Sequence, residues 1–174
     1  MILVAISIRL FKEEDIPYKV KWINDEKNNK YLHYDLPLRE DKTLQWFKSI
    51  QDKEDRADYT ITYNNKPVGI IGLVDINFQE KDAEYYICVG EDEYKGKGVA
   101  KIATDLLIKE AYTKIGLKKI YLFTELANVR AQKFFEKYGF RKVKLLKNHL
   151  FYNDRYIDRY LYMLNIESHL KSGE

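Results

Sequence analysis

The chain has 174 residues, a length typical of one domain with a substantial core. Hydrophobic residues make up 45%, which argues against disorder, and 30 Lys and Arg are interleaved with 27 Asp and Glu, so the net charge of +3 forms no basic stripe for nucleic acid. One cysteine excludes an internal disulfide framework and an all-cysteine zinc site, three widely separated histidines argue against a metal site, and the apolar runs are too short to span a membrane.

The first half of the chain predicts one strand, two helices and then a meander of strands. Weak alternation at the N-terminus indicates the strand, and three acidic residues, which suit the positive end of a helix dipole, begin the first helix. Polar turns separate the three later strands, as in antiparallel hairpins. In chain order these predicted elements cover residues 2–9, 13–24, 40–52, 58–64, 68–76 and 84–89.

The second half predicts helices and strands in alternation, then a hairpin. The first helix is amphipathic and ends at Gly116; the second begins at Asn128 and ends at Gly139. The segment after the hairpin is expected to fray. The predicted helix, strand, helix and two hairpin strands cover residues 99–114, 118–124, 128–138, 140–152 and 155–164. This order indicates a mixed sheet with helices packed on it.

The strongest local feature is a glycine-bearing loop between a predicted strand and a predicted helix. Gly96 and Gly98 let the backbone approach a ligand closely, and the free amides of the first helical turn attract an anion. Lys95, Lys97 and Lys101 add positive charge. This pattern predicts a pyrophosphate cradle, although an ordinary glycine-bearing helix start gives the same pattern.

Two motifs at the right separation resemble those of the GCN5-related N-acetyltransferase (GNAT) superfamily. Lys95–Ala100 is similar to the Gln/Arg-x-x-Gly-x-Gly/Ala signature, with lysine in the first place, and Asn128–Phe140 is similar to the second motif. The resemblance extends over residues 7–164. It implies an α/β (α+β mixed) fold with a largely antiparallel sheet of six to seven strands and about four helices, as one acetyltransferase domain over 1–166 with a tail over 167–174.

The resemblance also implies that the chain binds acetyl-CoA as cosubstrate and needs no metal. The loop amides and lysines are expected to hold the pyrophosphate, and one strand is expected to pair with the pantetheine arm and to polarise the thioester carbonyl. The cofactor-binding residues that it implies are Ile87, Cys88, Val89, Lys95, Gly96, Lys97, Gly98, Val99, Ala100, Lys101, Asn128 and Phe135.

Transfer of an acetyl group to an amine calls for a base and benefits from an acid. An alkylamine is mostly protonated at pH 7, so a base must take its proton, and an acid helps the thiolate to leave. Many superfamily members carry an acid tyrosine where this chain has Phe135, so Tyr138 is the alternative acid, unless it only packs. Glu84 is the first candidate base, ahead of Glu125 and Asp75, unless it is a solvated charge at a strand entrance.

The acceptor remains open between three amine classes within the branch that the early segment resembles. The hairpin around His149 resembles that of amino-sugar-nucleotide acetyltransferases and favours that acceptor; Trp22 and His149 are the candidate substrate contacts, although core and strand-surface roles would also account for them. A polyamine is the alternative, since Glu13, Glu14, Asp25 and Glu26 offer acidic groups, and a ribosomal-protein N-terminus is another. A non-catalytic CoA-binding module is the alternative that Phe135 leaves open.

The expected partners follow from these classes. They are a small-molecule amine or an amino-sugar nucleotide, with no nucleic acid and no membrane, and a homodimer is favoured because dimers are frequent in the superfamily. Residues 1–6 are too short for a signal peptide and follow no basic residue, so a cytoplasmic location is the default expectation.

Overall fold

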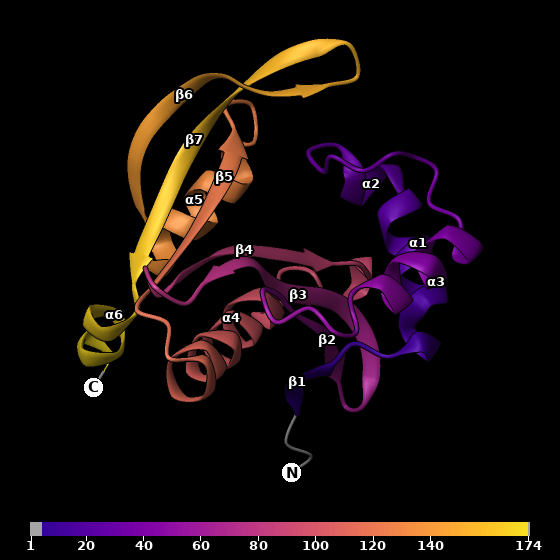
Figure 1. Ribbon diagram of the computed structural model, residues 1–174, viewed down its shortest axis with the longest axis horizontal. Helices are drawn as coiled ribbons and strands as arrows, with labels where there is room; N and C mark the ends of the chain where they lie inside the picture. Colours follow the sequence, from indigo (N-terminus) through magenta and orange to yellow (C-terminus); the bar gives the residue numbers. More distant parts are fainter. Residues whose placement is uncertain (1–4, 174) are drawn as a thin grey trace.

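The computed structural model describes residues 5–173, and its framework is one twisted sheet with helices on both faces (Figure 1). The strand order is β1-β2-β3-β4-β5-β7-β6. Only β4 and β5 are parallel; the other neighbouring strands of the described residues pair antiparallel. The strands are β1 Ile6–Leu10, β2 Ala57–Tyr63, β3 Lys66–Asn77, β4 Asp82–Val89, β5 Lys119–Glu125, β6 Arg141–Tyr152 and β7 Arg155–Asn165. The mixed, largely antiparallel fold predicted from the sequence is therefore confirmed.

The helices follow the predicted order with local differences. A 3₁₀ turn over Glu13–Asp15 precedes α1, and a π turn over Ala111–Ile115 extends α4 towards Gly116. Residues 2–4 of the first predicted strand, 2–9, lie outside the described residues. The helices are α1 Ile16–Asn24, α2 Glu26–Asn29, α3 Glu40–Ser49, α4 Val99–Glu110, α5 Val129–Tyr138 and α6 Ile166–Ser172. No helix within residues 5–173 is long and apolar enough to cross a bilayer.

Two helices stand where the sequence predicted irregular chain. Helix α2 lies between the predicted helices over 13–24 and 40–52, and Asp25 caps it by accepting a hydrogen bond from the Lys27 amide at 3.0 Å. Helix α6 replaces the expected frayed tail: Asn165 accepts from the Ser168 amide at 2.9 Å, and Ile166 is fully buried. The Asn165 cap and the burial of Ile166 stabilise a helix in a segment whose composition predicts irregular chain.

Strands β4 and β5 diverge, and this divergence positions the site. They pair only where Asp82–Glu84 faces Lys119–Tyr121. Beyond that point β5 stays with β7 and β4 stays with β3, so among the described residues no strand pairs with Tyr85–Val89 of β4 on its β5 side. Figure 1 shows β5, β7 and β6 rising away from the layer of β1–β4.

The two faces of the β1–β4 layer carry different helices. Ala83 and Tyr85 point into the larger core, where Ala103 and Leu107 of α4 pack against them. Tyr86 belongs to the smaller core under α1–α3. Because side chains alternate along a strand, Glu84 shares the face of Tyr86 and lies on the side of the N-terminal helices.

Candidate active site

The loop before α4 is built to hold an anion. Gly96 and Gly98 have φ of 74° and 78°, the left-handed region that favours glycine, and a Cβ at either position would meet only open space. Gly98 is the N-cap of α4, so the amides at Val99 and Ala100 have no partner within the helix. The positive end of the helix dipole points the same way. These features fit the pyrophosphate of acetyl-CoA.

The three lysines of the loop differ in their surroundings. Lys95 Nζ donates to Asn28 Oδ1 at 2.6 Å and to Asp92 Oδ1 at 2.7 Å. Lys97 Nζ lies 5.6 Å from the centre of a tyrosine ring, and Lys101 Nζ pairs with an aspartate of its own helix at 3.1 Å. Asn28 and Asp92 therefore hold the Lys95 side chain in place, whereas Lys97 and Lys101 are exposed to solvent.

The predicted pantetheine strand offers its backbone on one side only. Ile87, Cys88 and Val89 pair with β3, and their other edge faces the divergence from β5. Burial raises the pKa of the Cys88 thiol to about 11, which makes a thiolate nucleophile unfavourable there. The feature of this segment that fits the predicted pairing with pantetheine is its backbone edge, which no strand within residues 5–173 occupies on the β5 side.

Glu84 is the last β4 residue paired with β5, opposite Tyr121. It is half-buried, and burial raises the pKa of its carboxyl; the charge of Asp75 raises that pKa further and Arg159 opposes both. A carboxylate with a raised pKa, placed where the strands separate, is a suitable general base. Asp75 is exposed, on a bulge of β3 with φ of 52°.

A second polar group lies on the same face, along β5 and the β6–β7 arm. Glu125 is buried, and its Oε2 lies 3.0 Å from His33 Nε2. The Arg159 guanidinium lies 4.6 Å from the centre of the Phe123 ring and donates from Nε to His149 Nδ1 at 3.1 Å. Burial and the Arg159 charge lower the pKa of His149, so this imidazole is neutral and accepts at Nδ1.

The segment after α2 spans the divergence. Tyr31 donates from its hydroxyl to the Ala127 carbonyl at 3.1 Å, just beyond β5, and the Tyr34 carbonyl accepts from Tyr152 at 2.5 Å. With the His33 contact, these bonds connect the N-terminal helices to the β5–β7 half of the sheet. Residues 31–34 thus bridge the divergence of β4 and β5.

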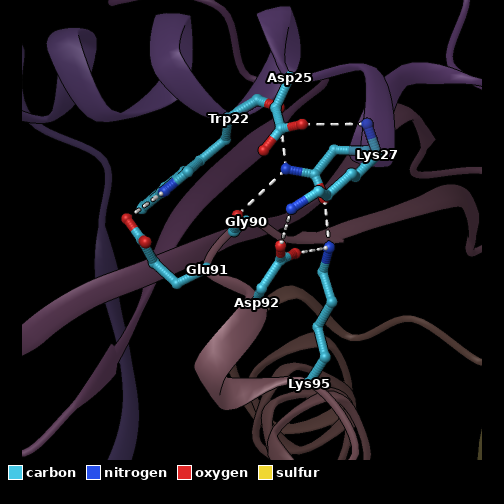
Figure 2. Close-up of polar contacts among 8 residues, drawn as sticks. Trp22, Asp25, Lys27, Gly90, Glu91, Asp92 and Lys95 are labelled. Atoms are coloured by element: carbon cyan, nitrogen blue, oxygen red, sulfur yellow. Dashed lines mark hydrogen bonds and ion pairs between the residues drawn. The ribbon is translucent and has the colours of Figure 1, made fainter.

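Trp22 is buried and does not face this divergence. Its indole is 1% exposed and lies against Gly90, and its Nε1 donates to Glu91 at 2.9 Å (Figure 2). This burial corrects the expectation that Trp22 contacts the acceptor: it anchors α1 to the loop that follows β4.

The residues of the second motif are mainly structural. Phe135 is 8% exposed and packs on Tyr85, with ring centres 5.7 Å apart. Asn128 accepts from the Ala131 amide at 3.3 Å as the N-cap of α5. Tyr138 donates to Asp105 at 2.5 Å and stacks on His169 of α6.

The position and contacts of Tyr138 argue against its candidacy as the acid, which stays a prediction to be tested. Helix α6 follows the end of β7 that pairs with the start of β5 at Lys119, the end where β4 and β5 are still joined. Burial first, and then the hydrogen bond to Asp105, raise the pKa of Tyr138 well above its usual value. A weakly acidic phenol at the closed end of the strand pair is not placed to protonate a thiolate at the open end.

Sequence reasoning missed the partners that come from distant segments. Asn28, Glu91 and Arg159 carry no local signal, because each gains its role from a contact with a residue at least ten positions away. Among residues 5–173, no group of three or more His, Cys, Asp or Glu side chains is arranged to hold a metal ion.

Comparison with known proteins gives consistent matches. A family model described as an acetyltransferase (GNAT) domain matches residues 6–141. Spermidine N(1)-acetyltransferase of Escherichia coli K12 is 27% identical over 154 residues, which is 87% of this chain and 81% of the relative. Spermidine N(1)-acetyltransferase of Vibrio cholerae is 25% identical over 155 residues, 88% of each chain. The crystal structure of the Vibrio cholerae spermidine N-acetyltransferase in complex with CoA and spermine superposes with a TM-score of 0.86 at 22% identity, covering 95% of this chain and 98% of the other.

Proposed function

Because the chain belongs to the GNAT acetyltransferase family and is therefore an acetyl-CoA-dependent N-acetyltransferase, we propose that its acceptor is a primary amine of a polyamine. The relatives at 25% and 27% identity are spermidine acetyltransferases, which favours this alternative over the amino-sugar nucleotide preferred from the hairpin. His149, the hairpin residue expected to contact a sugar nucleotide, instead accepts a hydrogen bond from Arg159. Because the chain belongs to this family, we favour an N-acetyltransferase over the non-catalytic CoA-binding module.

The observation that carries the proposal is the pair of carboxylates where β4 and β5 separate. Glu84 is half-buried there, and Asp75 is close enough to raise its pKa. Two carboxylates attract a protonated amine, and the one with the raised pKa can take its proton. The buried Glu125, further along the same face of β5 than the partner of Glu84, adds a third acidic group.

The residues of the chain divide the reaction between them. Acetyl-CoA supplies the acetyl group as a thioester. The loop amides and the free edge of β4 hold and orient it, and Glu84 takes the proton that the ammonium must lose, directly or through water. The amine nitrogen then attacks the carbonyl carbon and the C–N bond forms; the nitrogen gives up its second proton to water, and the C–S bond breaks. The sulfur leaves as a thiolate, which its pKa near that of cysteine, about 8.5, permits without an acid tyrosine at position 135.

The test is thiol release from acetyl-CoA with spermidine, a 4-amino sugar nucleotide and a short N-terminal peptide as separate acceptors. Release with spermidine and little with the other two supports the proposal. Release with the sugar nucleotide or the peptide alone would overturn it.

A variant pair assigns the base. Glu84→Gln is expected to lower kcat roughly 10²-fold or more, the usual loss on removing a general base. Glu80→Gln, in the exposed turn before β4, is the control and should retain full activity.

A further inference from the structure

A polar network joins the N-terminal helices to the cofactor loop (Figure 2). Asn28 makes three of its hydrogen bonds. Asn28 Nδ2 donates to the Trp22 carbonyl at 3.0 Å and to the Gly90 carbonyl at 3.1 Å. Asn28 Oδ1 accepts from Lys95 Nζ at 2.6 Å. One side chain of α2 therefore holds the end of α1, the end of β4 and the first lysine of the loop signature.

Two further contacts support the same junction. Glu91 accepts from the Trp22 indole and from Lys21, both at 2.9 Å. Asp92 accepts from Lys27 at 2.8 Å and from Lys95 at 2.7 Å, and these two cations lower the pKa of Asp92 to about 2. The loop is thus clamped to α1 and α2 before the chain reaches Gly96.

The same helices lead to the divergence of β4 and β5. After α2 the chain runs through residues 31–34, which contact Ala127, Glu125 and Tyr152 across the divergence of β4 and β5. Residues 31–34 and the cofactor loop are therefore parts of one connected unit, and Asn28 is the side chain that contacts Lys95 from the helical part.

We propose that Asn28 is a positioning residue for acetyl transfer, which presets Lys95 and the Gly90 carbonyl and so fixes the cofactor loop against residues 31–34. Asn28 touches neither the thioester nor the amine; it acts through Lys95. The proposal deepens the proposed function and rests on its cofactor half, the binding of acetyl-CoA at this loop, not on the identity of the amine. Preset groups bind a ligand without the cost of ordering them.

The experiment compares Asn28→Ala with Asn29→Ala. Asn29 is the next residue of α2, equally half-buried, and its side chain donates only to Ile23 within the helical pair among the described residues. Calorimetry measures acetyl-CoA binding without any acceptor. Asn28→Ala is expected to weaken acetyl-CoA binding about tenfold, a loss in keeping with one charged hydrogen bond. The KM for acetyl-CoA should rise by the same factor, while kcat stays within about twofold of the parent. Asn29→Ala should stay within about twofold of the parent in both.

A double-mutant cycle then tests the route through Lys95. If Asn28 acts by holding Lys95, Asn28→Ala should add little to the loss that Lys95→Met already causes. Equal effects of the two asparagine variants, additive effects in the cycle, or a fall in kcat with unchanged acetyl-CoA affinity would each overturn the proposal. If Asn28→Ala does not fold, Asn28→Leu replaces it: it keeps the side-chain volume but loses the oxygen that accepts from Lys95, and acetyl-CoA binding at the parent level would overturn the proposal.

The binding arm separates this proposal from the polyamine proposal. A failure of spermidine to react leaves the calorimetric comparison intact, because that comparison contains no amine. Equal acetyl-CoA affinities in the parent, Asn28→Ala and Asn29→Ala would reject the role of Asn28 even if spermidine is acetylated.

Discussion

The Trp22 ring lies so close to the Gly90 backbone that a Cβ at position 90 would stand 2.0 Å from Trp22 Cγ. Figure 2 shows the indole alongside this part of the loop. The ring cannot step aside, since Trp22 is 1% exposed and its Nε1 is bound to Glu91. Position 90 is thus held to glycine by close packing and not by a left-handed φ.

Gly90→Ala is expected to destabilise the chain by roughly 1–3 kcal/mol or more, because the added methyl group overpacks a rigid ring. Chemical denaturation measures this. Gly173→Ala is the control, since a Cβ there would meet atoms only at 3.9 Å. A fully stable Gly90→Ala variant would show that α1 is not packed on this loop as described.

Gly98→Glu is expected to abolish acetyl-CoA binding, because a side chain and a negative charge would enter the anion cradle. Gly116→Glu is its matched control: both glycines have left-handed φ, 78° and 81°, and open space at Cβ. Both variants should therefore lose similar stability, about 1 kcal/mol. Calorimetry with acetyl-CoA separates them, and unchanged affinity in Gly98→Glu would place the cofactor elsewhere.

Local signals predicted the parts of the fold that depend on neighbours in sequence. Gly116 and Gly139 end their helices with positive φ, and Asn128 caps α5, as expected from residue type. The caps at Asp25 and Asn165 are equally local, so residue type alone also indicates where α2 and α6 begin. Short helices have little periodicity, so their caps are the main signal.

The candidate site was less predictable, because its polar partners come together from distant segments. The glycine loop was found from its own motif, whereas the contact of Asn28 with Gly90 spans 62 positions and that of His33 with Glu125 spans 92. Trp22 was assigned to the substrate because it is an early aromatic residue; only the packing against Gly90 shows otherwise. The cofactor roles of the loop residues stay predictions, as does the homodimer.

The pH dependence of kcat/KM should move in opposite directions in two variants near Glu84. The base is active when ionised, so activity falls as pH drops through its pKa, which lies above the ordinary value near 4.5. Asp75→Asn removes a charge that raises this pKa and should shift the acidic limb to lower pH. Arg159→Gln removes a charge that lowers it and should shift the limb to higher pH. Profiles that move together, or not at all, would exclude Glu84 as the titrating base.

Tyr138→Phe should leave kcat within about twofold, because its hydroxyl is bound to Asp105 at the closed end of the β4–β5 pair. The lost hydrogen bond should lower the free energy of unfolding by about 1 kcal/mol. Steady-state kinetics and denaturation on the same preparation decide between the two roles. A hundredfold fall in kcat with unchanged stability would restore Tyr138 as the acid.

Lys19→Met is expected to stabilise the chain by about 1 kcal/mol at pH 7. Burial lowers the pKa of Lys19 to about 8 from 10.5, a cost of about 3 kcal/mol for the charged form at neutral pH. Its Nζ lies 3.4 Å from the centre of the Trp46 ring, and this cation–π contact offsets part of that cost. Between pH 8 and 10.5 the unfolded chain binds the proton that the folded chain has released, so stability rises with pH in that window and the advantage of methionine shrinks.

Denaturation of the parent and Lys19→Met at pH 7 and pH 10 measures this change. Lys48→Met, at an exposed lysine of α3, is the control and should show no such pH dependence. Because methionine keeps most of the side-chain volume, a loss of stability at pH 7 would mean that the ring attraction outweighs the cost of burying the charge. The buried ammonium would then be a net support of the α1–α3 packing that carries Trp22 and Asn28 to the cofactor loop.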